Sequence, residues 1–391
     1  MNRRLAPIAV FLAVSTLGAA QAPARTSVPP PLVAHEWGTF TSIAGEDGRA
    51  VDWLPLSGPP DLPCFVERVR FDIKGRLPGK VRMETPVLYF YSPQDITVNV
   101  NVRFRQGVVT EWFPHAAVTP SSVDGSTVGR SDFVGSITWS GVKVSPRVTA
   151  DFPTDRSSSH YYRARQTDAS GLQLGAEKEK FLFYRGVGGF EPPISATVAP
   201  DGRIVVRNPS GDAIGDIILF ENRGGTMAYQ VRHGVGGRIT LGPLVLEGEF
   251  VPPQTELEQI LIARGLYPRE AGAMVATWRD SWFEEGTRLF YIPSRRAIDS
   301  ILPLAISPAQ AEITRVFVGR LELVTSTTMR EVAEAIARND RTTLGKYGRF
   351  LQPIVNRILT ERSSADRARL QASLQPLYNA FGATSAPAVC K

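Results

Sequence analysis

Two of the four histidines have a carboxylate and a tryptophan close by in the sequence, a combination that can bind a metal ion. Glu36 follows His35 directly, and His115 lies four residues after Glu111. Imidazole nitrogens and carboxylate oxygens suit zinc or another divalent cation, which acidifies a bound water for hydrolysis. If the two strands are neighbours, Glu36, Glu111 and at least one of the two histidines are predicted to lie in one cluster. A divalent metal is the cofactor that such a cluster would hold.

A structural role is the alternative for these residues. Successive residues of a strand point to opposite faces, so only one of His35 and Glu36 is able to coordinate a metal without a bulge. Trp37 and Trp112 would then pack in the core, while their polar neighbours satisfy the backbone or one another.

The candidate catalytic carboxylates are Glu36, Glu111, Glu284 and Glu285. A glycosidase needs two such groups facing each other across a sugar, and tryptophans often provide the stacking surface. The last two close a tryptophan-rich helix, where negative charge opposes the helix dipole. A structural ion pair is the simpler explanation for them. The arginines nearest in sequence are Arg279, Arg288, Arg295 and Arg296.

Other catalytic classes leave no signature in this chain. It has no Gly-x-Ser-x-Gly elbow, His-Glu-x-x-His pair, phosphate loop or dinucleotide fingerprint. The formal net charge of +6 is scattered along the sequence, so no nucleic-acid partner is expected.

Aromatic-rich β units with long polar loops favour a binding or structural role at the cell envelope, with a polysaccharide or protein as partner. The alternative is a secreted hydrolase, either metal-assisted or resembling a paired-carboxylate glycosidase.

The first residues are typical of an export signal. A basic head (Arg3, Arg4) precedes an uncharged apolar run that is too short to span a bilayer stably. Small residues then offer cleavage sites after Ala20 or Ala22, and the first is favoured because Pro23 follows the second. Residues 1–22 are therefore predicted to be a signal peptide, which would direct the protein to the periplasm or the extracellular space. No later segment reaches the ~18 apolar residues of a membrane span, so no transmembrane segment is expected after cleavage.

Cys64 and Cys390 are the two cysteines of the chain. In an oxidising compartment they would form a disulfide that ties the C-terminus to the N-terminal domain. The alternative is two separate thiols, because neither has the spacing of a metal or redox motif.

Alternating apolar residues predict a mainly β protein with α-helices, of the α+β multidomain class. We expect an N-terminal antiparallel domain resembling a β-sandwich, a small immunoglobulin-like β unit and a helical C-terminal part. The predicted order is a signal peptide (1–22), a linker (23–31), the N-terminal β domain (32–190), the immunoglobulin-like unit (191–251), an α/β segment (252–327), a helical tail (328–382) and a flexible C-terminus (383–391).

Three local patterns predict individual elements. Ile96–Arg105 alternates perfectly and is expected to form a hairpin with Val108–Phe113. Thr255 with Glu258 has the spacing of a capping box at a helix start. Met274, Trp278 and Trp282 follow at spacings of four, which places them on one face of a helix and favours packing over ligand binding.

Four segments of the sequence are distinctive: His35–Thr41 (HEWGTFT), Arg82–Pro86, Lys180–Gly186 and Ser281–Gly286. In these segments the chain resembles a group of uncharacterised exported bacterial proteins, and the similarity extends over most of the mature chain. The resemblance implies export, and it implies no activity, cofactor or catalytic residue.

The export signal gives a first testable prediction. When the full chain is expressed in a bacterial host, the protein recovered outside the cytoplasm should lack residues 1–20, because signal peptidase removes the apolar run. Intact mass spectrometry of that fraction measures the new N-terminus. Recovery of the uncleaved chain there would contradict the cleaved-signal interpretation.

Overall fold

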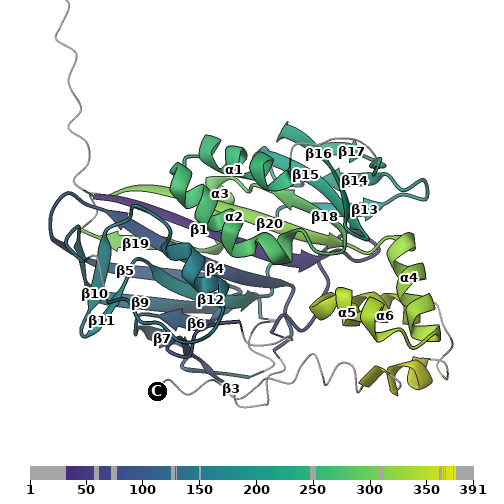
Figure 1. Cartoon of the computed structure of the whole chain (residues 1–391), viewed down its shortest axis with the longest axis horizontal. Helices are drawn as coiled ribbons and strands as arrows, with labels where there is room; N and C mark the ends of the chain where they lie inside the picture. The colour runs from purple at the N-terminus through teal and green to yellow at the C-terminus, as the bar shows by residue number, and fades with distance from the viewer. Residues whose placement is uncertain are drawn as a thin grey trace, which may run out of the picture.

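The computed structural model consists mainly of β-strands, with helices on one face and at one end (Figure 1). It describes residues 32–56, 61–71, 77–124, 128, 130–148, 151–246, 252–308, 311–360, 363, 365, 367–372 and 374–375. The predicted signal peptide, linker and flexible C-terminus lie outside these residues. Among the described helices, none is long and apolar enough to cross a membrane.

A nine-stranded sheet forms the centre of the molecule. Its strands, in spatial order, are β16 (Thr226–Val235), β15 (Ile214–Arg223), β18 (Gly286–Tyr291), β20 (Ala311–Leu323), β1 (Leu32–Ile43), β4 (Val81–Tyr91), β12 (Leu182–Gly188), β6 (Gly107–Phe113) and β2 (Glu67–Arg68). β1 and β20 pair in parallel, with Leu32 opposite Ala311, and the other pairs in this sheet are antiparallel. The purple and green arrows in Figure 1 show that two strands far apart in the sequence meet here.

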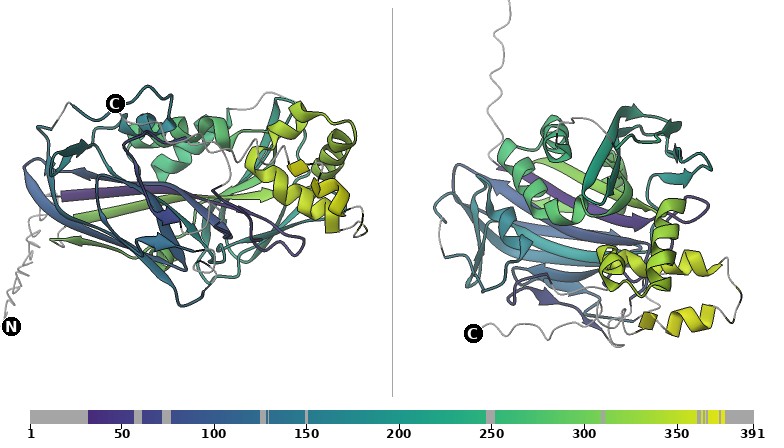
Figure 2. Two further views of the ribbon diagram at one scale, coloured as in Figure 1. Left: turned by 90° about the horizontal axis from the view of Figure 1, so that it is seen from below. Right: turned by 45° about the vertical axis from the view of Figure 1, so that its right-hand side comes forward.

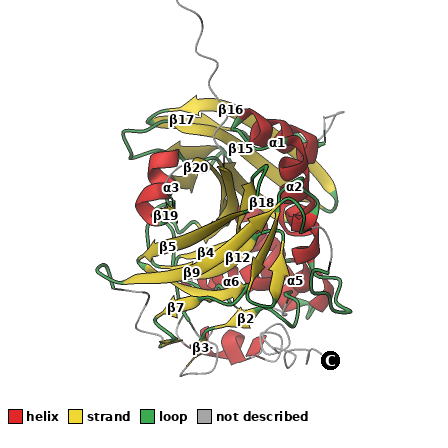
Figure 3. Ribbon diagram, turned by 90° about the vertical axis from the view of Figure 1, so that its left-hand side faces the viewer, coloured by secondary structure: helices red, strands yellow, loops and turns green. Residues whose placement is uncertain are grey.

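A six-stranded sheet covers one face of the central sheet (Figure 3). Its members are β11 (Glu177–Glu179), β10 (Gly171–Leu174), β9 (Val134–Ser145), β5 (Ile96–Arg105), β19 (Leu304–Ser307) and, paired with β9, β7 (Ala117–Thr119). The side chains between the two sheets form an apolar core that includes Phe40, Phe104 and Trp139. This pair of sheets confirms a β-rich fold, since alternating apolar residues of both sheets face the same interior.

Two helices and a 3₁₀ turn cover the other face. These are α1 (Pro253–Ala263), α2 (Pro268–Trp282) and η1 (His160–Arg165), which pack on a second core. As predicted, Met274, Trp278 and Trp282 share one face of α2 and are buried, with exposed fractions of 0%, 5% and 1%. The rings of the two tryptophans stack with centroids 6.3 Å apart. This row of side chains, which we call the tryptophan stripe, is therefore part of the core.

Two smaller units complete the fold. A three-stranded sheet of β13 (Ser195–Val198), β14 (Ile204–Arg207) and β17 (Arg238–Leu241) packs against β15, β18 and β20 through a separate apolar cluster. At the end of the central sheet lie α4 (Ser326–Ala337), α5 (Arg341–Lys346), η2 (Gly348–Phe350) and α6 (Leu351–Thr360), as Figure 2 shows. The remaining elements are α3 (Arg295–Ile301) and a two-stranded sheet of β3 (Arg70–Phe71) and β8 (Ser122–Val123).

Some sequence predictions are wrong about which strands become neighbours. β5 has the expected bounds and β6 begins one residue earlier than expected, but they form no hairpin, because the chain turns at Gln106, which has a positive φ of 53°, and enters the other sheet. The strands of the expected immunoglobulin-like unit pair as two hairpins, yet β15 and β16 join the central sheet while β13 and β14 do not. The predicted boundary at residue 190 therefore does not separate sheets.

The prediction of a capping box at Thr255 is also wrong. Helix α1 begins at Pro253, so its N-cap is Pro252, three residues before Thr255, and this proline provides no side-chain hydrogen bond. Proline suits the first helical position because its fixed φ is already helical and its missing N–H has no partner to lose there. The proline pair therefore determines the start of this helix.

The tryptophan stripe on α2 gives a second testable prediction. Trp278→Ala removes a buried indole and should lower the free energy of unfolding by about 3–5 kcal/mol. Denaturant titration measures the change, and Ile262→Ala on α1 is a suitable control because that side chain is 37% exposed. An unchanged stability in the tryptophan variant would mean that the indole is not part of the core.

Candidate functional site

His35 lies in a buried cluster at the start of helix α2. Its Nδ1 is 2.7 Å from Glu270 Oε2, and the Tyr91 hydroxyl donates to Glu270 Oε1 at 2.6 Å. The Tyr267 ring packs on the imidazole, and its backbone N–H donates to the same carboxylate at 2.9 Å. His35 is 3% exposed and Glu270 is fully buried. The cluster therefore fastens strands β1 and β4 to the helix and leaves no room for a substrate.

Glu36 points to the opposite face of the same strand, as the alternation predicts. Its carboxylate accepts hydrogen bonds from Arg315 Nε at 2.5 Å and from the Tyr184 hydroxyl at 2.6 Å. Arg315 also donates to Asp299 at 2.6 Å. Because Glu36 and Arg315 are both buried and paired, this carboxylate neutralises an internal cation, a structural role.

Glu111 and His115 lie far from this position. Strand β6 is separated from β1 by β4 and β12, a spacing of about 14 Å for three strand intervals. Glu111 accepts a hydrogen bond from its neighbour Thr110. The four candidate metal ligands thus form no common cluster, and the described residues contain no group of three or more His, Cys, Asp or Glu side chains placed to hold a metal.

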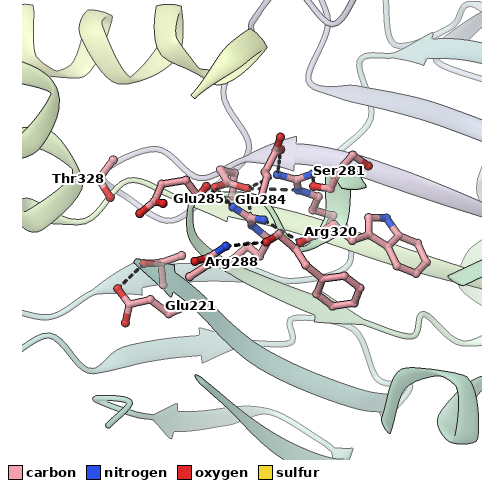
Figure 4. Close-up of polar contacts among 12 residues, drawn as sticks. Glu221, Ser281, Glu284, Glu285, Arg288, Arg320 and Thr328 are labelled. Carbon is pink, nitrogen blue, oxygen red and sulfur yellow. Dashed lines mark hydrogen bonds and ion pairs between the residues drawn. The ribbon is translucent and has the colours of Figure 1, made fainter. Parts of the chain in front are cut away.

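Glu284 and Glu285 lie at a buried row of charges (Figure 4). Arg320 Nη2 donates to Glu284 Oε1 at 2.7 Å and to Glu322 Oε2 at 2.9 Å. Arg288 Nε lies 3.1 Å from Glu322 Oε2, and both arginine side chains are fully buried. Glu284 is thus in an ion pair, but its partner comes from β20 and is none of the four arginines nearest in sequence.

The same two arginines close the end of helix α2. Arg320 Nη1 donates to the carbonyl of Ser281 and Arg288 Nη1 to that of Trp282, at 2.6 and 2.7 Å. The last carbonyls of a helix lack partners within it, and cations there also complement the helix dipole. The Glu285 carboxylate accepts the backbone N–H of the β15–β16 turn at 3.1 Å. These contacts explain how two glutamates are tolerated at a helix C-terminus.

The row of charges continues onto β4 and β12. Glu84 Oε1 lies 2.8 Å from Arg349 Nη2, and Arg185 binds both oxygens of Asp61 at 2.8 Å. Burial raises the pKa of the Glu84 carboxyl, but the surrounding arginines, Arg349 first, hold it below its ordinary value. We call these residues the charged layer: Asp61, Glu84, Arg185, Glu284, Arg288, Arg320, Glu322 and Arg349. Its groups neutralise one another, which indicates a structural role.

Accessible polar groups line a pocket at the edge of the central sheet. A pocket of about 620 Å³ is lined by Glu67, Arg68, Arg70, Trp112, His115, Ala116, Val118, Ser121 and Ser122. His115 Nδ1 lies 2.7 Å from Glu67 Oε1, and Trp112 Nε1 donates to Glu67 Oε2 at 2.9 Å. The His115 side chain is 74% exposed, whereas Trp112 is mostly buried and offers only part of its ring. The carboxylate therefore fixes the orientation of both rings at an open surface.

Of the ionisable residues at this pocket, sequence reasoning found only His115. Glu67, Arg68 and Arg70 were missed, although the alternation of charged and apolar residues from Arg68 to Phe71 has the period of a strand. The predicted Cys64–Cys390 disulfide involves a residue outside the described part of the chain and stays a prediction.

Comparison with known proteins adds no assignment. The chain matches no protein-family model and no curated protein sequence. The geometry of the pocket is therefore the basis on which a function can be assigned.

The charged layer gives a third testable prediction. Glu84→Gln leaves the Arg349 guanidinium without its buried counter-charge and should lower the free energy of unfolding by about 3–5 kcal/mol at neutral pH. Glu334→Gln removes an exposed partner of Arg338 and should change the free energy of unfolding by less than about 1 kcal/mol. Urea denaturation at pH 7 measures both.

The effect of Glu84→Gln should depend on pH with a definite sign. Because the folded-state pKa of Glu84 lies below its ordinary value of 4.5, the charged carboxylate stabilises the fold above pH 4.5. This contribution is lost as the pH falls through the folded-state pKa. The stability difference between wild type and variant should therefore shrink on acidification, and a constant difference would contradict the ion-pair explanation.

Proposed function

We propose that the protein is an extracytoplasmic binding protein of the cell envelope and that the pocket at strands β2 and β6 holds its ligand, an envelope polysaccharide. One observation carries this proposal: among the polar clusters described above, the pocket alone combines accessible side chains with an open volume. The charged groups of the His35 cluster and of the charged layer are paired within the protein, and most of them are buried. They stabilise the fold and leave recognition to the pocket.

The chemistry of the lining suits a saccharide. Sugars present hydroxyl groups around an apolar C–H face, and they bind where polar groups surround part of an aromatic ring. Here Trp112, Ala116 and Val118 supply the apolar surface, while two serines, an imidazole and two guanidiniums supply hydrogen bonds. Glu67 holds His115 and Trp112 in place before a ligand arrives, which reduces the ordering that binding requires.

Export supports the same role. The predicted signal peptide would deliver the protein to the compartment in which envelope polysaccharides are found. Loops that join the strands of a rigid sheet are common positions for binding residues. The lining residues His115, Ala116 and Ser121 lie in such connecting segments after β6, whereas Val118 and Ser122 belong to the short strands β7 and β8.

A hydrolase is the second candidate, and the His115–Glu67 contact is the observation that favours it. A carboxylate that holds one imidazole nitrogen orients the other as a general base, and two serine hydroxyls line the same pocket. A paired-carboxylate glycosidase has less support, because Glu67 is the single carboxylate among the described lining residues.

The test compares two histidine variants of the full chain. His115→Ala should weaken binding to a panel of soluble envelope polysaccharides by at least about tenfold, because the imidazole and the orientation of Glu67 are lost together. His160→Ala, which changes a partly exposed histidine elsewhere, should leave the affinity unchanged. Isothermal titration calorimetry measures the affinities.

Two other results would change this assignment. Failure of every polysaccharide to bind, or equal affinity of wild type and His115→Ala, would overturn the binding proposal. Hydrolysis of ester groups on the polysaccharide by the wild type, abolished in His115→Ala, would show the hydrolase instead.

A further inference from the structure

We infer, on the basis of the proposed function, that the polysaccharide recognised by this pocket is anionic and that Arg68 and Arg70 bind its carboxylate or phosphate groups. The lining contains two arginine side chains, Arg68 and Arg70, and one acidic side chain, Glu67. Both oxygens of Glu67 already accept hydrogen bonds, from Trp112 and from the His115 ring. One positive charge therefore remains for a ligand.

Arg68 and Arg70 differ from four arginines in the interior of this sheet. Arg185, Arg288, Arg315 and Arg320 are buried and each is paired with a carboxylate. Arg68 and Arg70 are exposed, and no ion pair or hydrogen bond within the described part of the chain involves either guanidinium. They are two residues apart in an extended segment, which places them on the same side of the backbone.

This arrangement matches the chemistry of an acidic sugar. The planar guanidinium fork binds carboxylate and phosphate oxygens in a bidentate manner, and serine hydroxyls donate to the same groups. Ser121 and Ser122 line the pocket beside the arginines, while the apolar side chains Ala116 and Val118 face the space in which a sugar ring would lie. A uronic acid or a phosphate-bearing sugar satisfies both halves of this lining, whereas a neutral glycan would leave the two cations unpaired.

The test uses three oligosaccharides of equal length: a neutral glucan, an alginate fragment carrying carboxylates, and a phosphorylated glucan. Wild-type full-chain protein should bind at least one anionic oligosaccharide about tenfold or more tightly than the neutral one at low salt. The double variant Arg68→Gln/Arg70→Gln should lose this preference. Which of the two anionic compounds binds more tightly distinguishes carboxylate from phosphate recognition.

A charge-matched control is needed, because a chain with a net charge of +6 attracts polyanions non-specifically. Arg147→Gln/Arg296→Gln removes two exposed arginines outside the pocket, whose side chains are 83% and 86% exposed. This variant should keep the preference for the anionic compound. Equal losses in both double variants would overturn the inference, since the attraction would then be non-specific.

The remaining outcomes separate this inference from the proposed function. If neutral and anionic compounds bind equally and His115→Ala weakens both, the pocket binds saccharides and the anionic class is wrong. If none of the three compounds binds, the inference fails, and the wider polysaccharide panel then decides the proposed function. Circular dichroism of each variant, unchanged from wild type, confirms that a loss of binding is not a loss of fold.

Discussion

The parallel pairing of β1 with β20 is the constraint on which the rest of the structure depends. It joins the first described strand to one that lies about 280 residues later, as the register of Leu32 with Ala311 shows. These two strands occupy the middle of the nine-stranded sheet, with layers on both faces. Nearly every residue of β1 is therefore buried, whichever face its side chain points to.

Burial on both faces determines what the polar residues of the central strands do. A buried charge without a partner is strongly destabilising, so each such group must meet an opposite charge or a hydrogen-bond partner. His35 meets Glu270, Glu36 meets Arg315, and Arg320 meets Glu322. His35 and Glu36, which the sequence offered as metal ligands, therefore hold the layers together. The groups that are open to a ligand lie at the sheet edge.

Backbone irregularities lie next to the charged layer. The registers of β1 with β4 and of β4 with β12 shift between Trp37 and Thr39 and between Phe183 and Gly186. Thr85 has a positive φ of 47°, which is strained for a β-branched residue. A Cβ at Gly186 would lie 2.3 Å from the Val108 carbonyl oxygen, so only glycine allows the strands to approach there. Three of the four distinctive sequence segments, His35–Thr41, Arg82–Pro86 and Lys180–Gly186, lie on the neighbouring strands β1, β4 and β12 that carry these irregularities.

The sequence by itself determined the local structure: the alternation in Ile96–Arg105 and the buried tryptophan face of α2 both follow from periodicity. Tertiary structure alone decided which strands became neighbours, because pairing between distant segments has no local signal. It therefore also decided that His35 and His115 lie apart, that Arg320 is the partner of Glu284, and that Glu67 joins His115 at the pocket. Those contacts depend on packing between segments from tens to hundreds of residues apart, which residue types and spacing do not specify.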